Sequence, residues 1–294
     1  MRCFALNLPI AAPGATVPWS RHYQGIKQMA RSALLNVMVQ SALKAGRSLA
    51  RDFGEVQNLQ VSLKGPGDFV SQADLKAESI IKAELMRARP TYGFMGEESE
   101  EQTGSDGAHR WIVDPLDGTT NFLHGIPHFA VSIALERNGD IVAGVIYNPA
   151  TDELYTAERG GGAFLNDRRL RVAGRKALSD AVVGTGVPHL GRGHHGKFLV
   201  ELRHVMAECA GIRRMGAAAL DLAYVAAGRL DGFWEKPLEP WDMAAGLILI
   251  REAGGFVSDM TGGTDMFGTK SVAAGNEYIL KGVLDLVQRP VPAT

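Results

Sequence analysis

The segment 111–122 (WIVDPLDGTTNF) constrains this chain more than any other stretch. Its apolar start predicts the end of a buried strand, and Pro115 prevents a regular continuation because its ring fixes the backbone and removes an N–H donor. Asp114 and Asp117 therefore stand three residues apart where this strand ends. Two carboxylates without a Cys or His ligand suit Mg²⁺ or Mn²⁺ better than zinc.

Gly118 and Thr119 follow these acids directly. Exposed backbone N–H groups at such a position suit a phosphate oxyanion. An isolated Asp-x-x-Asp-Gly sequence is also typical of a simple turn, so the choice depends on what the rest of the chain supplies.

The composition is that of an ordinary globular protein: 294 residues, 46% hydrophobic and 21% charged. Such a chain can form one large domain or two closely packed halves. Lys plus Arg total 31 against 32 for Asp plus Glu, which gives no support for direct nucleic-acid binding or for attraction to an acidic membrane surface. Cys3 and Cys209 fit neither a disulfide framework nor a metal cluster, and no apolar run is long enough to span a membrane. We therefore expect a cytoplasmic protein.

The first residues are the one oddity in this composition. The stretch 1–24 starts like a weak signal peptide, but Asn7 and Pro9 interrupt its apolar part. Helical spacing of apolar residues begins only after Met29. We expect residues 1–28 to be a disordered extension, or the result of a start codon placed too early, and residues 29–294 to form the folded domain.

A Gly/Pro loop over 61–68, which carries Lys64, is predicted between the first two helices. The second helix is predicted to open near Ser71 and to end at Pro90. Asp74 falls on its apolar face, where it serves either as part of a capping box with Ser71 or as part of a polar site. The sequence leaves these two roles open.

Strands dominate from Phe129 to Leu170, and Asn138-Gly139 predicts a type I′ hairpin turn. Helices are predicted again near 196–209, 217–227 and 242–253. Helix pairs around an antiparallel meander indicate a layered α/β arrangement rather than a regular parallel βαβ series.

Further acidic residues stand at positions that could join Asp114 and Asp117. Glu97 follows a short apolar run and is predicted at another strand end, although the acids at 98–101 also fit a solvated charge run. Asp242 opens an apolar helix, where the N-cap is its simplest role. Glu235 lies in an aromatic and proline-marked loop, a setting typical of a pocket wall.

Three motifs together resemble the inositol monophosphatase family, within the lithium-sensitive, magnesium-dependent phosphatases. They are GEES at 96–99, DPLDGTTN at 114–121, and WDMAAG at 241–246 with EAGG at 252–255. The segments 127–133 and 216–233 are most similar to the bacterial branch. The resemblance implies a layered αβαβα sandwich, of the inositol monophosphatase and fructose 1,6-bisphosphatase type, usually assembled as a homodimer.

The resemblance also implies roles for individual residues. Two to three Mg²⁺ ions (or Mn²⁺) would be bound, with Asp114 as the bridging ligand. The implied metal ligands are Glu97, Asp114, the backbone carbonyl of Leu116, Asp117 and Asp242. Asp74 and Thr119, with Glu97, would act in catalysis by orienting the attacking water, so no Ser, Cys or His nucleophile is needed.

The implied substrate contacts lie beside these ligands. They are Asp117, Gly118, Thr119, Ala218, Glu235 and Asp242. Lys64 would lie on a mobile loop over the metals, and Ser71 replaces the usual Thr of the family. The histidines carry no predicted role: His124 and His128 fit packing or rim positions, and residues 194–195 fit an exposed loop.

The predicted activity is Mg²⁺-dependent hydrolysis of myo-inositol 1-phosphate, or of a related polyol phosphate. Fructose 1,6-bisphosphate, a 3′-phosphoadenosine nucleotide and histidinol phosphate are alternative substrates for the same site. A different class of function is that of a regulatory binding protein. The resemblance to the bacterial branch implies this alternative, because some bacterial relatives associate with the transcription machinery while retaining the phosphatase fold.

Overall fold

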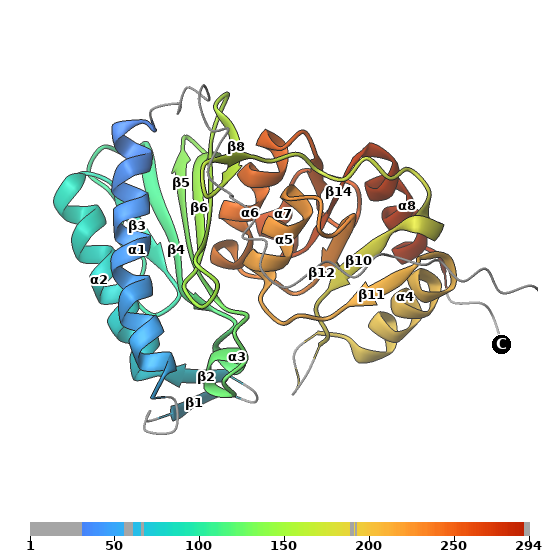
Figure 1. The fold of residues 1–294 in the computed structure, drawn as a ribbon, viewed down its shortest axis with the longest axis horizontal. Helices are drawn as coiled ribbons and strands as arrows, with labels where there is room; N and C mark the ends of the chain where they lie inside the picture. Colours follow the sequence, from blue (N-terminus) through green and yellow to red (C-terminus); the bar gives the residue numbers. More distant parts are fainter. Residues whose placement is uncertain (1–30, 56–60, 66–67, 189–190, 192, 291–294) are drawn as a thin grey trace, which may run out of the picture. The chain divides into compact units, whose positions relative to one another are not determined.

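The computed structural model describes residues 31–55, 61–65, 68–188, 191 and 193–290, with the backbone alone for 61–65 and 68–71 (Figure 1). The predicted N-terminal extension, residues 1–28, lies outside the described residues.

A seven-stranded sheet holds most of the first half of the chain. Its strands are, in spatial order, β3 (Gly93–Gly96), β4 (His109–Asp117), β5 (Ala130–Arg137), β6 (Asp140–Asn148), β7 (Glu153–Glu158), β8 (Gly162–Leu165) and β9 (Arg168–Arg169). β3 and β4 are parallel, and every other pair is antiparallel. The predicted meander is therefore confirmed.

A second sheet of five strands is built from the later part of the chain. Its spatial order is β11 (Gly211–Arg213), β10 (Val182–Thr185), β12 (Gly232–Glu235), β14 (Val272–Gly275) and β13 (Phe256–Ser258). β11, β10 and β12 are parallel, whereas β14 is antiparallel to both of its neighbours.

Three pairs of helices cover the faces of these sheets (Figure 1). α1 (Ala33–Phe53) and α2 (Gln72–Ala88) pack on the outer face of the seven-stranded sheet, α5 (Ala218–Ala226) and α6 (Pro240–Glu252) lie between the two sheets, and α4 (His195–Glu208) and α8 (Glu277–Val287) cover the five-stranded sheet. Three short helical segments complete the described elements: α3 (Thr119–Leu123), α7 (Met266–Thr269) and η2 (Leu178–Asp180). This arrangement is the predicted αβαβα sandwich.

Each interface between layers has its own hydrophobic cluster. The central one is dominated by α5, in which all residues but Tyr224 are buried, and by α6, in which residues 243–250 are buried. Because both helices are covered by a sheet on each side, they are apolar around their whole circumference rather than amphipathic. Their N-termini are consequently held rigidly, which is important because both of them reach the site described below.

Local sequence signals explain several element boundaries. Ser32 caps α1 by accepting a hydrogen bond from the Leu35 N–H at 3.0 Å. Asn138 and Gly139 have φ values of 53° and 84°, as a type I′ turn requires.

The loop predicted over 61–68 is a different element in the structure. β1 (Val61–Gly65) and β2 (Asp68–Ser71) pair antiparallel there. The prediction of a loop was therefore wrong, because the Gly and Pro residues were taken to break the whole segment.

Among the helices that the structure describes, none combines the length and the apolar character needed to cross a lipid bilayer.

Candidate active site

Two neighbouring parallel strands deliver the first acids of the site. Gly96, the last residue of β3, pairs with Val113 of β4, and the Glu97 N–H donates to the Val113 carbonyl at 3.2 Å. Glu97 and Asp114 therefore leave adjacent strands side by side. The predicted strand-end position of Glu97 is confirmed.

The segment that follows Val113 does not end the strand, contrary to the prediction. β4 continues to Asp117, with a register shift against β5 between Asp114 and Asp117. Pro115 lies within this irregularity, where its missing N–H leaves no gap in the ladder. The shift places both carboxylates at the same edge of the sheet, and the side chains are 2% and 8% exposed.

Gly118 makes the tight turn that follows. Its φ is 87°, and a Cβ added there would lie 2.9 Å from the His128 carbonyl oxygen, so both backbone conformation and space favour glycine. Thr119 then begins α3, with its Oγ1 3.0 Å from the Leu116 carbonyl and 3.2 Å from Asp74 Oδ2.

Asp74 thus belongs to the site. It is 1% exposed, and its carboxylate accepts from Thr119, which lies 45 residues further along the chain. Of the two roles that the sequence left open, the contact with Thr119 favours the polar site.

The opposite wall is formed where α5 and α6 begin. The Ala219 N–H donates to Asp117 Oδ2 at 2.7 Å, which ties the first turn of α5 to the carboxylates of the seven-stranded sheet. Asp242 lies in the first turn of α6. The prediction that it is the N-cap of this helix was wrong. The N-cap is Glu239 and Pro240 is the first helical residue, a position that proline favours. Asp242 is the third residue, and its Oδ2 accepts from the Glu239 N–H at 2.7 Å in a capping box.

Glu235 also lies at a strand end, whereas the sequence placed it in a loop. It is the last residue of β12 and pairs with Val272 of β14. A Cβ added at Gly186 would collide with its carboxylate, so the absence of a side chain there makes room for it. Lys236, the next residue along the chain, pairs with Glu201 at 2.6 Å rather than with Glu235.

These elements enclose a cavity of about 190 Å³. Its lining contains every predicted site residue except Asp74, which contacts the cavity wall through Thr119. The lining comprises Glu97, Asp114, Leu116, Asp117, Gly118, Thr119, Thr120, Gly186, Val187, Pro188, Arg214, Gly216, Ala217, Ala218, Glu235, Lys236, Pro237, Leu238 and Asp242.

The buried acids raise one another's affinity for protons. Burial, and then the charges of Glu97, Asp117 and Asp242, hold the pKa of Asp114 well above its ordinary value. Burial raises the pKa of Asp117 to about 7, although the Ala219 N–H lowers it in part. A divalent cation among these oxygens would reverse the effect by stabilising the ionised forms. The donor set therefore fits a hard divalent cation.

Burial likewise raises the pKa of Glu235 well above its ordinary value, and the neighbouring Asp221, Asp242 and Asp117 add to this effect. Arg214 acts in the opposite direction. Arg214 is among the residues that line the cavity. Neither Arg214 nor Asp221 was predicted from the sequence, because neither belongs to a motif that predicts a ligand.

The sequence suggested that Glu98 belongs to a solvated charge run, but the structure places it beside the acids of the site. It is half-buried, its N–H donates to Glu78 Oε2 at 2.8 Å, and oxygens of Asp74, Glu97 and Glu98 lie within 4.8 Å of one another. This group could hold a metal ion.

The histidines near the site have packing roles. His128 is buried, burial lowers its pKa to about 4, and its Nε2 lies 4.0 Å from Asp221 Oδ1. His124 is exposed at the end of α3. His194 and His195 are exposed but do not form a loop: His194 caps α4 by accepting from the Lys197 N–H at 3.0 Å. The side chains of Lys64 and Ser71, to which the family resemblance gave roles, lie outside the described part of the chain.

Known proteins with similar sequences support the same kind of site. The family model described as "Inositol monophosphatase family" matches residues 30–289. The chain is 76% identical over 265 residues to an inositol-1-monophosphatase of Rhizobium meliloti, covering 90% of this chain and 100% of that protein. It is 45% identical over 263 residues to the Nus factor SuhB of Pseudomonas aeruginosa, covering 88% and 97%.

Among solved structures, the chain is similar to the extragenic suppressor protein suhB of Bartonella henselae. The TM-score is 0.87 at 66% identity, and the match covers 88% of this chain and 100% of that one. The predicted family and fold are confirmed, and the chain belongs to the inositol monophosphatase family.

Proposed function

We propose that this protein is a metal-dependent phosphomonoesterase that hydrolyses myo-inositol 1-phosphate to inositol and inorganic phosphate. The observation that carries the proposal is the single cavity in which buried carboxylates face Gly118, Thr119 and Glu235. A hard cation, a phosphate and a polyhydroxy alcohol each find suitable groups there. Membership of the family, and relatives named inositol-1-monophosphatase, support the same substrate.

The ions would be two to three Mg²⁺, with Mn²⁺ as a substitute. The residues that would hold them are Glu97, Asp114, the Leu116 carbonyl, Asp117 and Asp242. When bound, they supply charge neutralisation of the phosphate and lower the pKa of water. The charges of four other carboxylates help to raise the pKa of Asp114, and a residue in such surroundings suits the role of a bridging ligand.

Asp74 and Thr119 would orient the attacking water, with Glu97 as the third catalytic residue. The Thr119 hydroxyl has one proton and two acceptors within reach, Asp74 and the Leu116 carbonyl. When it donates to Leu116, its lone pairs and the Asp74 carboxylate are both available to a water between them. This supports an arrangement that positions water without a covalent nucleophile.

The alcohol of the substrate would lie toward α5 and β12. The proposed contacts are Asp117, the Gly118 and Thr119 N–H groups, the Ala218 backbone, Glu235 and Asp242. Glu235 can accept hydrogen bonds from vicinal hydroxyls, and its position against Gly186 fixes where these bonds form. Arg214 faces the same side of the cavity, where it offsets the negative charge.

Two further expectations, a homodimer and sensitivity to lithium, follow from the family resemblance, and a cytoplasmic location is expected from the cysteine content of the sequence. A regulatory interaction with the transcription machinery is a second candidate, supported by the name of the Pseudomonas aeruginosa relative. The intact set of carboxylates favours a protein that retains catalysis in either case.

A phosphate-release panel tests the proposal. Inositol 1-phosphate, fructose 1,6-bisphosphate, a 3′-phosphoadenosine nucleotide and histidinol phosphate would be compared with Mg²⁺ present, after treatment with EDTA, and after Mg²⁺ is restored. We expect the highest kcat/KM with inositol 1-phosphate, loss of activity in EDTA, and recovery with Mg²⁺. Preference for a bisphosphate would redirect the proposal to another substrate, and full activity without metal would end it.

A further inference from the structure

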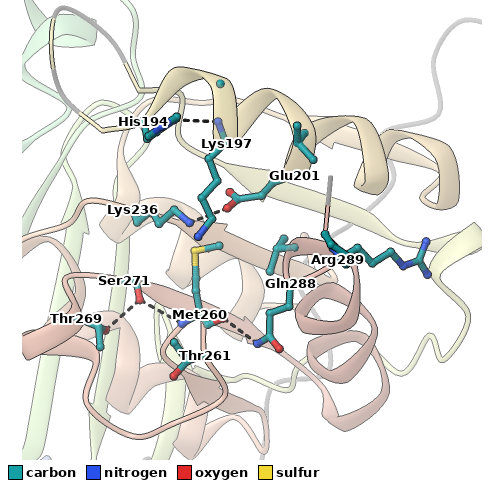
Figure 2. A pocket seen from close by; sticks show the side chains of 14 residues that line it. His194, Lys197, Glu201, Lys236, Met260, Thr261, Thr269, Ser271, Gln288 and Arg289 are labelled. Atoms are coloured by element: carbon teal, nitrogen blue, oxygen red, sulfur yellow. Dashed lines mark hydrogen bonds and ion pairs between the residues drawn. The ribbon is translucent and has the colours of Figure 1, made fainter. Parts of the chain in front are cut away.

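A second and larger cavity lies beside the five-stranded sheet, where it is bounded by α4, the end of β12, and α8 (Figure 2). Its volume is about 840 Å³, within the range of small-molecule sites. Nothing in the proposed phosphatase chemistry uses it. Its lining residues are His194, Gly196, Lys197, Val200, Glu201, Lys236, Met260, Thr261, Thr269, Ser271, Val287, Gln288, Arg289 and Pro290.

The side chains that line this cavity carry more positive than negative charge. Lys197 and Lys236 extend toward each other into it, as Figure 2 shows. Lys236 is paired with the buried Glu201 at 2.6 Å, and Arg289 points outward to Glu208 at 3.2 Å. Among the residues that the structure describes, no carboxylate lies within ion-pair distance of Lys197. The lining of this cavity therefore holds two ammonium groups and one carboxylate, which is paired with Lys236, and an incoming anion would meet a net positive charge.

The remaining walls divide into a polar and an apolar part. Thr261, Thr269 and Ser271 bring hydroxyl groups, with Thr269 and Ser271 bonded to each other at 3.0 Å. Val200, Met260 and Val287 bring apolar surface. A ligand that matches both parts has an anionic end and an apolar body.

We propose that this cavity is a binding site for a small organic anion of the phosphate or phosphonate type. Its acidic group lies between Lys197 and Lys236, and its apolar body packs against Val200, Met260 and Val287.

The position of Lys236 links this cavity to the active site. Lys236 follows Glu235 directly and lines both cavities. An anion that competes with Glu201 for Lys236 would move the Lys236 side chain, and with it the position of the neighbouring Glu235 carboxylate in the active site. This coupling rests on the proposed role of Glu235 in substrate binding, whereas the binding site itself does not.

Isothermal titration of the full-length protein with benzylphosphonate tests the site, because a C–P bond resists the proposed phosphatase activity. We expect saturable 1:1 binding in EDTA, since this cavity lies apart from the acidic cluster, and this binding should persist in Mg²⁺. Methylphosphonate should bind about tenfold more weakly or worse, because it lacks the body that contacts the apolar wall. Absence of binding at millimolar concentration, or binding that requires Mg²⁺, would overturn the proposal.

Two substitutions with opposite expected effects locate the binding. Lys197→Gln should weaken benzylphosphonate about tenfold, and Glu201→Gln should strengthen it several-fold by freeing Lys236. Lys281→Gln, an exposed lysine of α8 outside the cavity, is the matched control and should leave the affinity unchanged. A merely structural role for these charges would not give changes of opposite sign. An affinity unaffected by Lys197→Gln would place the ligand elsewhere.

The coupling has its own readout. At a concentration that fills this cavity in the wild type but not in Lys197→Gln, benzylphosphonate should raise the KM for inositol 1-phosphate more in the wild type, because competition at the active site is common to both. Equal effects would overturn the coupling while leaving the binding site intact. A protein with no phosphatase activity would contradict the proposed function, and the titration would still decide whether the anion binds.

Discussion

The two sides of the active-site cavity are built in different ways. On the Asp114 side, Glu97 follows the end of β3, Asp114 and Asp117 lie in the last four residues of the parallel strand β4, and Asp74 joins them from α2. On the Glu235 side, the groups come from β12, the loop after β10, and the first turns of α5 and α6. The first side is fixed by a sheet edge and one short motif, whereas the second is assembled from four distant segments. Under the proposed function, chemistry would belong to the first side and substrate selection to the second.

Charge distinguishes the two sides as well. The Asp114 pKa is raised by burial and by four other carboxylates, which is the condition that a bound cation relieves. The Glu235 pKa is also raised by burial, but Arg214 partly compensates. A carboxylate that has a basic side chain nearby is better suited to accept hydrogen bonds from a neutral alcohol than to hold a cation.

Replacement of Asp114 should have the largest effect. Asp114→Asn removes the charge at the centre of the acidic cluster, so we expect kcat to fall about a thousandfold or more with both inositol 1-phosphate and p-nitrophenyl phosphate. Steady-state phosphate release measures the loss, and circular dichroism checks the fold. Asp140→Asn, an exposed acid on β6, is the control and should keep normal rates. Near-normal activity of Asp114→Asn would show that the chemistry lies elsewhere.

Asp74→Asn should have the next largest effect. The amide keeps the shape and can still contact Thr119, but it cannot accept a proton, so kcat should fall about a hundredfold or more while KM stays within a few-fold. Glu78→Gln replaces another buried acid of α2 and serves as the matched control. A rise in KM with unchanged kcat would move Asp74 from catalysis to binding.

Gly186→Ala should have a smaller effect, confined to the second side. The added methyl displaces the Glu235 carboxylate without changing its charge, so we expect the KM for inositol 1-phosphate to rise about tenfold and that for p-nitrophenyl phosphate to change little. Gly184→Ala on the same chain segment meets Leu230 and Phe233 instead, and it controls for general overpacking. Equal changes in both variants would assign the effect to stability.

The smallest expected effect is on stability and its dependence on pH. Because the pKa values of Asp114 and Asp117 are raised, the latter to about 7, the metal-free folded protein retains protons that the unfolded chain has lost. Its stability should therefore fall as pH rises from 6.5 to 8. The lowered pKa of His128 acts in the opposite direction, but only below its ordinary value of 6.5. Thermal unfolding should show a gain in Tm from Mg²⁺ that is several degrees larger at pH 8 than at pH 6.5. A gain that does not depend on pH would contradict these shifts.

The same contrast explains how much the sequence could predict. Glu97, Asp114 and Asp117 were identified because strand ends and a short motif are local patterns, and the layered fold followed from the order of helices and strands. Asp242 was placed at the wrong helix position, although Pro240 could have indicated that α6 begins earlier. The position of the Glu235 carboxylate against Gly186, and the presence of Arg214 in the cavity wall, depend on contacts between segments that are distant in sequence. A local sequence pattern does not contain this information.

The most direct test of the division between the two sides is the ratio of kcat/KM for inositol 1-phosphate to that for p-nitrophenyl phosphate. We expect Asp74→Asn to lower both values and leave the ratio unchanged. Glu235→Gln should lower the ratio about tenfold to a hundredfold, because only the natural alcohol loses a hydrogen bond to a charged group. Ratios that change equally in the two variants, or in neither, would contradict the assignment of chemistry to the Asp114 side and selection to the Glu235 side.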